Sequence, residues 1–136
     1  MADGGFEAPF KSWSTSGAAF QAARIESTGG DFNGDGRGDL AIVYDYSGAT
    51  GTHTFTATPD GGFNPPLASW KSGDGNWYAT SSGTPISGDT DRDGRADILM
   101  MYNYAAGDTR AFTLTSRPDG GFNGVQGSWY AAPGMF

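Results

Sequence analysis

Two stretches of the sequence decide the fold: GDFNGDGRGDLAIVYDY at residues 30–46 and GDTDRDGRADILMMYNY at residues 88–104. Each begins with a loop rich in Asp and Gly and continues directly into a series of apolar and aromatic residues. Their starts lie 58 residues apart, so the chain contains an internal repeat. A repeat of this length indicates one structural unit per copy.

A second repeated segment alternates with the first. DGGFEAPFKSW at 3–13, DGGFNPPLASW at 60–70 and DGGFNGVQGSW at 119–129 are three copies of it. In every copy an aromatic residue follows the tryptophan by seven positions, which gives the pairs Trp13 and Phe20, Trp70 and Trp77, and Trp129 and Phe136. The chain therefore contains two complete units that are preceded by one extra copy of this segment.

Each unit is predicted to form about four short strands. In the first unit we expect them at 21–27, 40–46, 53–58 and 63–70. The strand at 40–46 is nearly continuous in apolar residues, as in a strand covered on both faces, whereas 53–58 alternates as in a half-exposed strand. No window shows a sustained helical period, so we expect almost no helix.

A four-stranded unit that repeats in tandem is typical of a β-propeller blade. We therefore predict an all-β protein made of two four-stranded blades and one leading strand at 6–13. We expect a single domain over 1–136, divided into the leading strand (1–20), a first blade unit (21–77) and a second blade unit (78–136).

The composition excludes several classes of function. The net charge is −7 and the 8 basic residues are scattered, which argues against a nucleic-acid partner. There is no cysteine, so disulfides and zinc–thiolate sites are excluded. No apolar run approaches the roughly 18–20 residues of a membrane helix, so we expect no membrane partner.

The two Asp-rich loops have the composition of a cation site. Oxygen-bearing residues occupy positions 1, 3, 5 and 9 of each loop, glycine occupies position 6, and the carbonyl of an arginine is available at position 7. These candidate ligands are Asp31, Asn33, Asp35, Arg37 and Asp39 in the first loop and Asp89, Asp91, Asp93, Arg95 and Asp97 in the second. Asp, Asn and Gly also form ordinary turns, but converging carboxylates repel one another unless a cation lies between them.

Calcium fits these loops better than other metals. It accepts six to eight oxygen ligands in flexible geometry, whereas magnesium requires a rigid octahedron. An EF-hand would need a glutamate at position 12, where Ile42 and Met100 stand. We therefore expect two structural calcium ions per chain, held by loops that are not EF-hands.

These residues resemble the calcium-binding FG-GAP and VCBS-type repeats of bacterial secreted proteins, which are related in pattern to the blades of integrin α-subunit propellers. The resemblance covers both units, and its most specific element is the loop and strand at 30–46. It implies a propeller of about seven blades, calcium in the loops between strands, and roles in adhesion or carbohydrate binding. Two units are fewer than a closed ring needs.

A non-catalytic binding module is the function that we predict from these features. Hydrolysis would need an acid, base or nucleophile outside the metal loops, and the only histidine is His53. We expect a carbohydrate or cell-surface ligand, with Trp77, Tyr78 and Trp70 as candidate contacts because aromatic faces stack on sugars. Trp70 recurs in every unit, which is also typical of a packing residue. The alternatives are a self-assembling scaffold with purely structural calcium and a calcium-dependent hydrolase.

Two further expectations concern location and assembly. Extracellular calcium modules bind the ion at about 10⁻⁴–10⁻³ M, so we expect the protein to be secreted. Because two blades leave open sheet edges and faces, we also expect a ring-like homo-oligomer, with three chains as the first choice.

Overall fold

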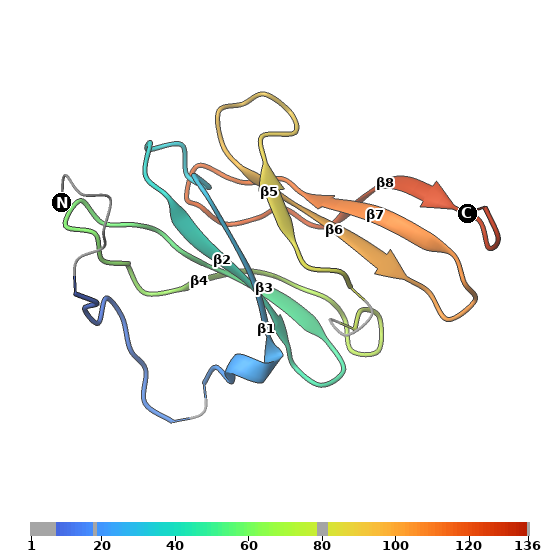
Figure 1. Ribbon diagram of the computed structural model, residues 1–136, viewed down its shortest axis with the longest axis horizontal. Helices are drawn as coiled ribbons and strands as arrows, with labels where there is room; N and C mark the ends of the chain where they lie inside the picture. Colours follow the sequence, from blue (N-terminus) through green and yellow to red (C-terminus); the bar gives the residue numbers. More distant parts are fainter. Residues whose placement is uncertain (1–7, 18, 79–81, 136) are drawn as a thin grey trace.

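A computed structural model describes residues 8–17, 19–78 and 82–135. It contains two four-stranded antiparallel sheets, each with its strands in chain order. The first sheet consists of β1 (Ile25–Gly30), β2 (Asp39–Asp45), β3 (Thr50–Phe55) and β4 (Leu67–Lys71). The second consists of β5 (Ile86–Gly88), β6 (Asp97–Asn103), β7 (Thr109–Leu114) and β8 (Gln126–Ala131). We call these sheets blade 1 and blade 2, and they confirm the predicted all-β fold (Figure 1).

The two blades share details of strand pairing that the sequence repeat predicts. β2 pairs with β3 as β6 pairs with β7, and β3 and β7 each carry a register shift at the equivalent position, between Thr52 and His53 and between Ala111 and Phe112. Within the described residues the only helix is a single 3-10 turn, η1 (Ala22–Arg24). No described helix has the length and apolar character needed to cross a membrane.

Several strand boundaries differ from the predictions. β3 begins at Thr50 because a tight hairpin, closed by the Tyr46 N–H donating to the Ala49 carbonyl at 2.8 Å, brings the chain back early. β4 begins at Leu67, after Pro65 and Pro66, because proline has no N–H to donate to a strand ladder.

The Thr-rich third strand is more buried than the predicted half-exposed strand at 53–58, because Thr54 and Phe55 in that range are both buried. Thr50 and Thr52, which precede that range in β3, are also fully buried. Thr54 faces blade 2, since a Cβ at Gly120 would lie 3.9 Å from its Cγ2. The prediction for the second strand is confirmed, since Ala41 to Tyr44 are all buried. Both faces of blade 1 are therefore covered.

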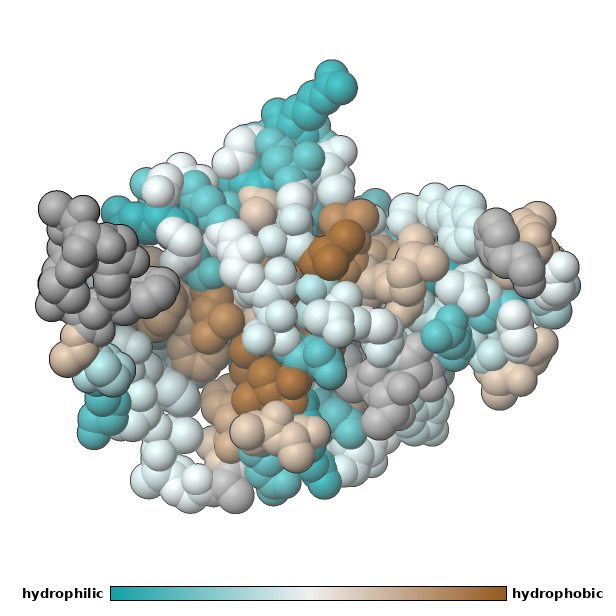
Figure 2. Space-filling model, viewed as in Figure 1, coloured by the Kyte–Doolittle hydropathy of each residue, from teal (hydrophilic) through white to brown (hydrophobic). Residues whose placement is uncertain are grey.

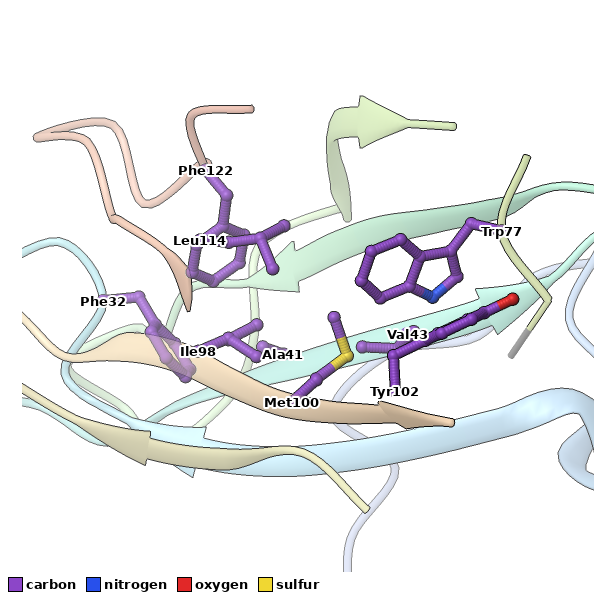
Figure 3. Packing of buried hydrophobic residues seen from close by; sticks show 9 residues of the cluster. All are labelled: Phe32, Ala41, Val43, Trp77, Ile98, Met100, Tyr102, Leu114 and Phe122. Atoms are coloured by element: carbon purple, nitrogen blue, oxygen red, sulfur yellow. The ribbon is translucent and has the colours of Figure 1, made fainter. Parts of the chain in front are cut away.

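One continuous core joins the two blades (Figure 3). β2 contributes Ala41 and Val43, and β6 contributes Ile98, Met100 and Tyr102. Aromatic side chains close the two ends of this core: the rings of Phe32 and Phe122 lie 5.3 Å apart at one end, and the Trp77 ring packs on Tyr102 at the other. Each blade supplies only half of this core, so neither sheet would bury it alone.

The predicted leading strand is wrong for the residues that the structure describes. Residues 8–13 lie outside any strand, and Phe6 and Glu7 lie outside the described residues. The segment matches the fourth strand of a blade, but among the described residues no third strand pairs with it. Trp13 of this segment and Phe20, which follows it, still pack on blade 1, with ring centroids 5.0 and 6.2 Å from that of Phe55.

Candidate metal centre

Both Asp-rich loops project from the same end of the two sheets, where β1 turns into β2 and β5 turns into β6 (Figure 1). Each loop is closed by its first aspartate. In the first loop Asp31 Oδ1 accepts hydrogen bonds from the N–H groups of Gly34 and Asp35 at 2.7 and 3.0 Å, and Oδ2 accepts one from Gly36 at 2.7 Å. The loop is thus folded around the carboxylate at position 1.

The second loop reproduces this arrangement. Asp89 Oδ1 accepts from the N–H groups of Arg92 and Asp93 at 2.6 and 3.2 Å, and Oδ2 accepts from Gly94 at 3.1 Å. Position 6 needs glycine in both loops because φ is +84° at Gly36 and +85° at Gly94. The two loops therefore have the same conformation, although their sequences differ at positions 2, 3, 4 and 8.

The aspartate at position 9 anchors each loop to the core. Asp39 and Asp97 are 3% and 0% exposed, the lowest values among the loop acids. Asp39 accepts from the N–H groups of Phe32 and Ala57 at 3.0 and 2.8 Å, and Asp97 accepts from those of Thr90 and Ser116 at 3.0 and 2.9 Å. Each carboxylate thus links the loop to the end of the third strand of its blade.

Three carboxylates converge in the second loop. Asp89, Asp91 and Asp97 each place an oxygen within 4.8 Å of the other two, and Asp97 is buried while the other two are exposed. The first loop has Asn33 in the place of Asp91, so its corresponding set holds two carboxylates and one amide oxygen. Among the described residues, the second loop is thus the one that brings together three acids.

The aspartate at position 5 faces an arginine of its own loop. Asp35 forms an ion pair with Arg37, and Asp93 forms one with Arg95. Partial desolvation raises the pKa of Asp35, but hydrogen bonds from Asn33 and Arg37 and the charge of Arg37 lower it below its usual value overall. A cation at this site would compete with the arginine for the same carboxylate.

The pKa of Asp39 shifts in the opposite direction, mainly because its carboxyl is buried and to a lesser extent because negative charge is crowded around it. Burial raises its pKa above the usual value, while hydrogen bonds from Ala57 and Phe32 lower it and the charges of Asp35 and Asp31 raise it again. A cation held between these acids would offset this repulsion. The carboxylates of the loop therefore fit a cation both in chemistry and in charge.

The three residues expected to contact a carbohydrate have different surroundings. Trp77 is 5% exposed, and its indole N–H donates to Ser82 Oγ at 3.0 Å. The hypothesis that Trp77 offers a stacking surface is therefore wrong for this fold. Trp70 is half-buried and packs on the core with its ring 5.8 Å from Trp77, which is the packing role considered above. Tyr78 is 45% exposed and remains available to a ligand.

A family model for FG-GAP-like repeats matches residues 31–100, just over half of the chain. The match begins at the first loop and ends within β6, so it includes both acidic loops. No curated protein and no solved structure shows significant similarity to the chain. The chain therefore belongs to the FG-GAP-like repeat family, and the resemblance predicted from the loops is confirmed.

Proposed function

We propose that this protein is a non-catalytic, calcium-stabilised repeat module that acts outside the cell and presents its blades to a glycan or another cell-surface ligand. The observation that carries the metal assignment is the convergence of Asp89, Asp91 and Asp97 within 4.8 Å. Like charges this close repel by several kcal/mol at intermediate dielectric, and a divalent cation removes that cost. We assign calcium because every candidate ligand is an oxygen and because calcium accepts oxygen ligands in flexible geometry.

The matching backbone geometry supports one calcium ion in each loop. The carboxylates at position 1 are held by three N–H donors in both loops, and those at position 9 by two. This leaves the remaining oxygen lone pairs of positions 1, 3 and 9 for a cation, and the position 5 carboxylate joins them when the cation displaces its arginine. The Arg37 and Arg95 carbonyls at position 7 would complete each site.

Calcium counting tests this proposal directly. Native mass spectrometry and calorimetry in millimolar calcium should show two ions per chain. Asp35→Ala and Asp93→Ala should each remove or strongly weaken one ion, whereas Asp60→Ala, in a turn outside both loops, should retain two. Each bound ion should stabilise the fold by about 2.7 kcal/mol at a hundredfold excess over its dissociation constant. Absence of bound metal in the wild-type chain would overturn the proposal.

A second candidate function, a self-assembling propeller scaffold, is favoured by the outer face of blade 2. Pairing registers place Leu99, Met101 and Ala111 at the positions that Ala41, Val43 and Thr52 occupy in blade 1. Ala41, Val43 and Thr52 are all buried on the side of blade 1 that packs against blade 2. In blade 2, by contrast, Met101 is 44% exposed and neighbouring Ile86 62% exposed, and an apolar pocket of about 170 Å³ lies between them.

A second copy of this chain is the occupant that this face fits, because it would continue the packing already seen between blades 1 and 2. Figure 2 shows one group of apolar side chains where β5 and β6 lie in Figure 1 and another lower in the view, on a surface that is mostly polar or neutral. A face of this kind on an otherwise polar surface indicates a contact with another protein chain. Sedimentation in calcium distinguishes this scaffold from a monomeric module.

A further inference from the structure

Blade 1 contains a small open pocket. The pocket has a volume of about 240 Å³ and is lined by Tyr46, His53, Ala68, Ser69, Trp70 and Lys71, which we call the Lys71 pocket. It lies at the β2–β3 hairpin and the end of β4, at the opposite end of β2 from the first acidic loop. It is therefore separate from the candidate metal centre.

Differences between the two repeats create the pocket. The pairing registers make Gly51 equivalent to Arg110, because these residues pair with Tyr44 and Tyr102. In blade 2 the Arg110 guanidinium lies over the rings of Tyr104 and Tyr130, at 4.8 and 5.1 Å from their centroids. Blade 1 has no side chain at this position, and a Cβ at Gly51 would approach Tyr46 Cε2 at 2.9 Å. The Tyr46 ring therefore rests on bare backbone, and the space beside it stays open.

Two further substitutions between the repeats give the pocket its chemistry. His53 pairs with Ile42 where Phe112 pairs with Met100, so an imidazole replaces an apolar ring. Lys71 pairs with Gly51 where Tyr130 pairs with Arg110, so an ammonium group replaces a phenol. In blade 1 the Lys71 Nζ lies 4.8 Å from the centroid of the Tyr46 ring, and Tyr46 Oη lies 2.7 Å from His53 Nε2. The three polar groups thus face one pocket.

Among the residues that the structure describes, Lys71 is the only charged one that lines the pocket. Burial lowers the pKa of His53 below its usual value, so the imidazole is neutral near pH 7. Burial and the neighbouring Tyr44 raise the pKa of Tyr46, so its hydroxyl keeps its proton. The pocket therefore carries one positive charge on a chain whose net charge is −7. A ligand with one negative charge complements it.

The Tyr46–His53 pair can supply a hydrogen-bond donor to such a ligand. The neutral pair shares one hydrogen bond, and if His53 Nε2–H donates to Tyr46 Oη, the Tyr46 hydroxyl proton is free to donate outward. A carboxylate would select this tautomer, because it accepts the Tyr46 O–H and the Lys71 ammonium together. The Tyr46 ring face and Ala68 offer apolar area to the C–H face of a sugar ring.

We propose that the Lys71 pocket is a subsite for a sugar residue that bears a carboxylate, such as a uronic acid. This inference rests on the proposed ligand-binding role of the module and gives that role a site and a ligand class, but it does not depend on calcium. In blade 2, which is flanked by blade 1, the equivalents of the β4 residues of the pocket, Gly127, Ser128 and Tyr130, are all exposed. The equivalents of Tyr46 and His53, which are Tyr104 and Phe112, pack against the core between the blades. The β4 side of the pocket thus stays accessible when blades pack together.

The test is a titration of ¹⁵N-labelled protein, saturated with calcium, with glucuronate, glucose and acetate. Glucuronate should shift the resonances of Tyr46, His53 and Lys71. It should bind about tenfold more tightly than glucose, since a charge-assisted hydrogen bond contributes at least that factor. It should also bind more tightly than acetate, which lacks the sugar ring that packs on Tyr46 and Ala68. Lys71→Gln and Tyr46→Phe should remove this preference. Lys11→Gln changes the other lysine, which is exposed and outside the pocket, and should leave the preference intact.

The possible outcomes separate this inference from the proposed function. Equal binding of glucose and glucuronate, or a preference that survives Lys71→Gln, would overturn the inference. Acetate binding as tightly as glucuronate would show an anion site without a sugar subsite, and would also overturn it. In all these cases two calcium ions per chain and glycan binding elsewhere, for example at Tyr78, would leave the proposed function standing. Shifts confined to the acidic loops would report chelation of calcium by the carboxylate and would count against the inference.

Discussion

The backbone N–H of Ala96 donates a 2.7 Å hydrogen bond to the carbonyl oxygen of Asp31, so the second acidic loop is tied directly to the first. Asp31 is position 1 of the first loop, and Ala96 lies between positions 7 and 9 of the second. The side chain of Arg95 in the second loop also lies against the backbone of Gly34 in the first, because a Cβ at Gly34 would lie 3.2 Å from Arg95 Cγ. A change in the conformation of one loop must therefore affect the other.

From this contact we predict that the two calcium sites are coupled. Asp93→Ala should weaken calcium binding at the first loop by about fivefold, although Asp93 belongs to the second loop. Asp35→Ala should weaken the second site by the same factor, because linkage between binding sites is reciprocal. Calorimetric titration of both variants and of the wild-type chain measures these affinities. If the remaining site in each variant keeps its wild-type affinity, the loops are independent.

The buried and exposed acids of one loop should have different roles. Asp97→Ala should destabilise the fold even in chelator, by about 1–3 kcal/mol, because the buried N–H of Ser116 and the part-buried N–H of Thr90 lose their acceptor. Asp91→Asn is the matched control, since Asp91 is exposed and accepts one hydrogen bond, from Asp93. It should weaken calcium binding and leave the chelated protein as stable as wild type. Denaturant unfolding in chelator checks both expectations, and equal losses would contradict this division.

The packing of Trp77 predicts a large loss of stability on truncation. Its ring lies 4.6 Å from Tyr102 and 4.7 Å from Phe112, and the side chain is almost fully buried between the blades. Trp77→Ala should therefore cost about 3–5 kcal/mol in free energy of unfolding. The adjacent Tyr78→Ala, at an exposed position, should cost less than about 1 kcal/mol. Thermal unfolding of the two variants measures this difference. Equal losses of stability would show that Trp77 does not stabilise the packing of blade 2 on blade 1.

How far the sequence predicts this fold depends on which interactions decide each feature. Both loops and both central strands could be predicted because their chemistry is local: alternate oxygens, a glycine at position 6 and a continuous apolar strand lie within 17 residues. The threonines of β3 could not be placed, because alternation with polar residues does not show that a second sheet will cover the polar face. Thr52 is buried by blade 2, which is a tertiary effect.

The candidate sites follow the same rule. The spacing of residues in the two repeated loops was sufficient to predict the metal ligands. It did not show that Trp77 packs in the core and is not exposed to a ligand. The repeat did contain a signal for the packing role of Trp77. Phe20 is the residue equivalent to Trp77, and its ring packs on Tyr44 of blade 1 at 5.4 Å. A position that is aromatic in all repeats indicates packing. The Lys71 pocket has the opposite signal, because it is formed where the repeats differ, and comparison of Gly51 with Arg110 could have located it.

His53 should make the fold sensitive to mild acid. Its pKa in the folded chain is lowered by burial, so between the ordinary value of 6.5 and this lowered value the unfolded chain binds more protons than the folded one. Stability is therefore unaffected by His53 above pH 6.5, falls as the pH drops below it, and levels off below the folded pKa. His53→Phe, which installs the residue of blade 2, should remove this component. Denaturant unfolding of the wild-type chain and of His53→Phe in chelator, between about pH 7 and 5, isolates the contribution of His53. If the free energies of unfolding of the two proteins change in parallel with pH, His53 is not the cause of the acid sensitivity.

The outer face of blade 2 gives the last prediction, which concerns assembly. The residues equivalent to Met101 and Leu99 in blade 1 are Val43 and Ala41, and both are buried to at least 99% by the neighbouring blade. If a second copy supplies that neighbour, the chain should sediment in calcium at a multiple of 14.2 kDa, with three chains and six blades as the first expectation.

Met101→Glu should shift this assembly to the monomer, because the contact would then bury an unpaired carboxylate. Met135→Glu is the matched control: Met135 is 61% exposed and follows β8, outside this face, so its replacement should leave the mass unchanged. Sedimentation velocity of the three proteins over a range of concentrations provides the measurement. A wild-type chain that stays at 14.2 kDa throughout would rule out self-assembly through this face and leave the monomeric binding module as the function of the fold.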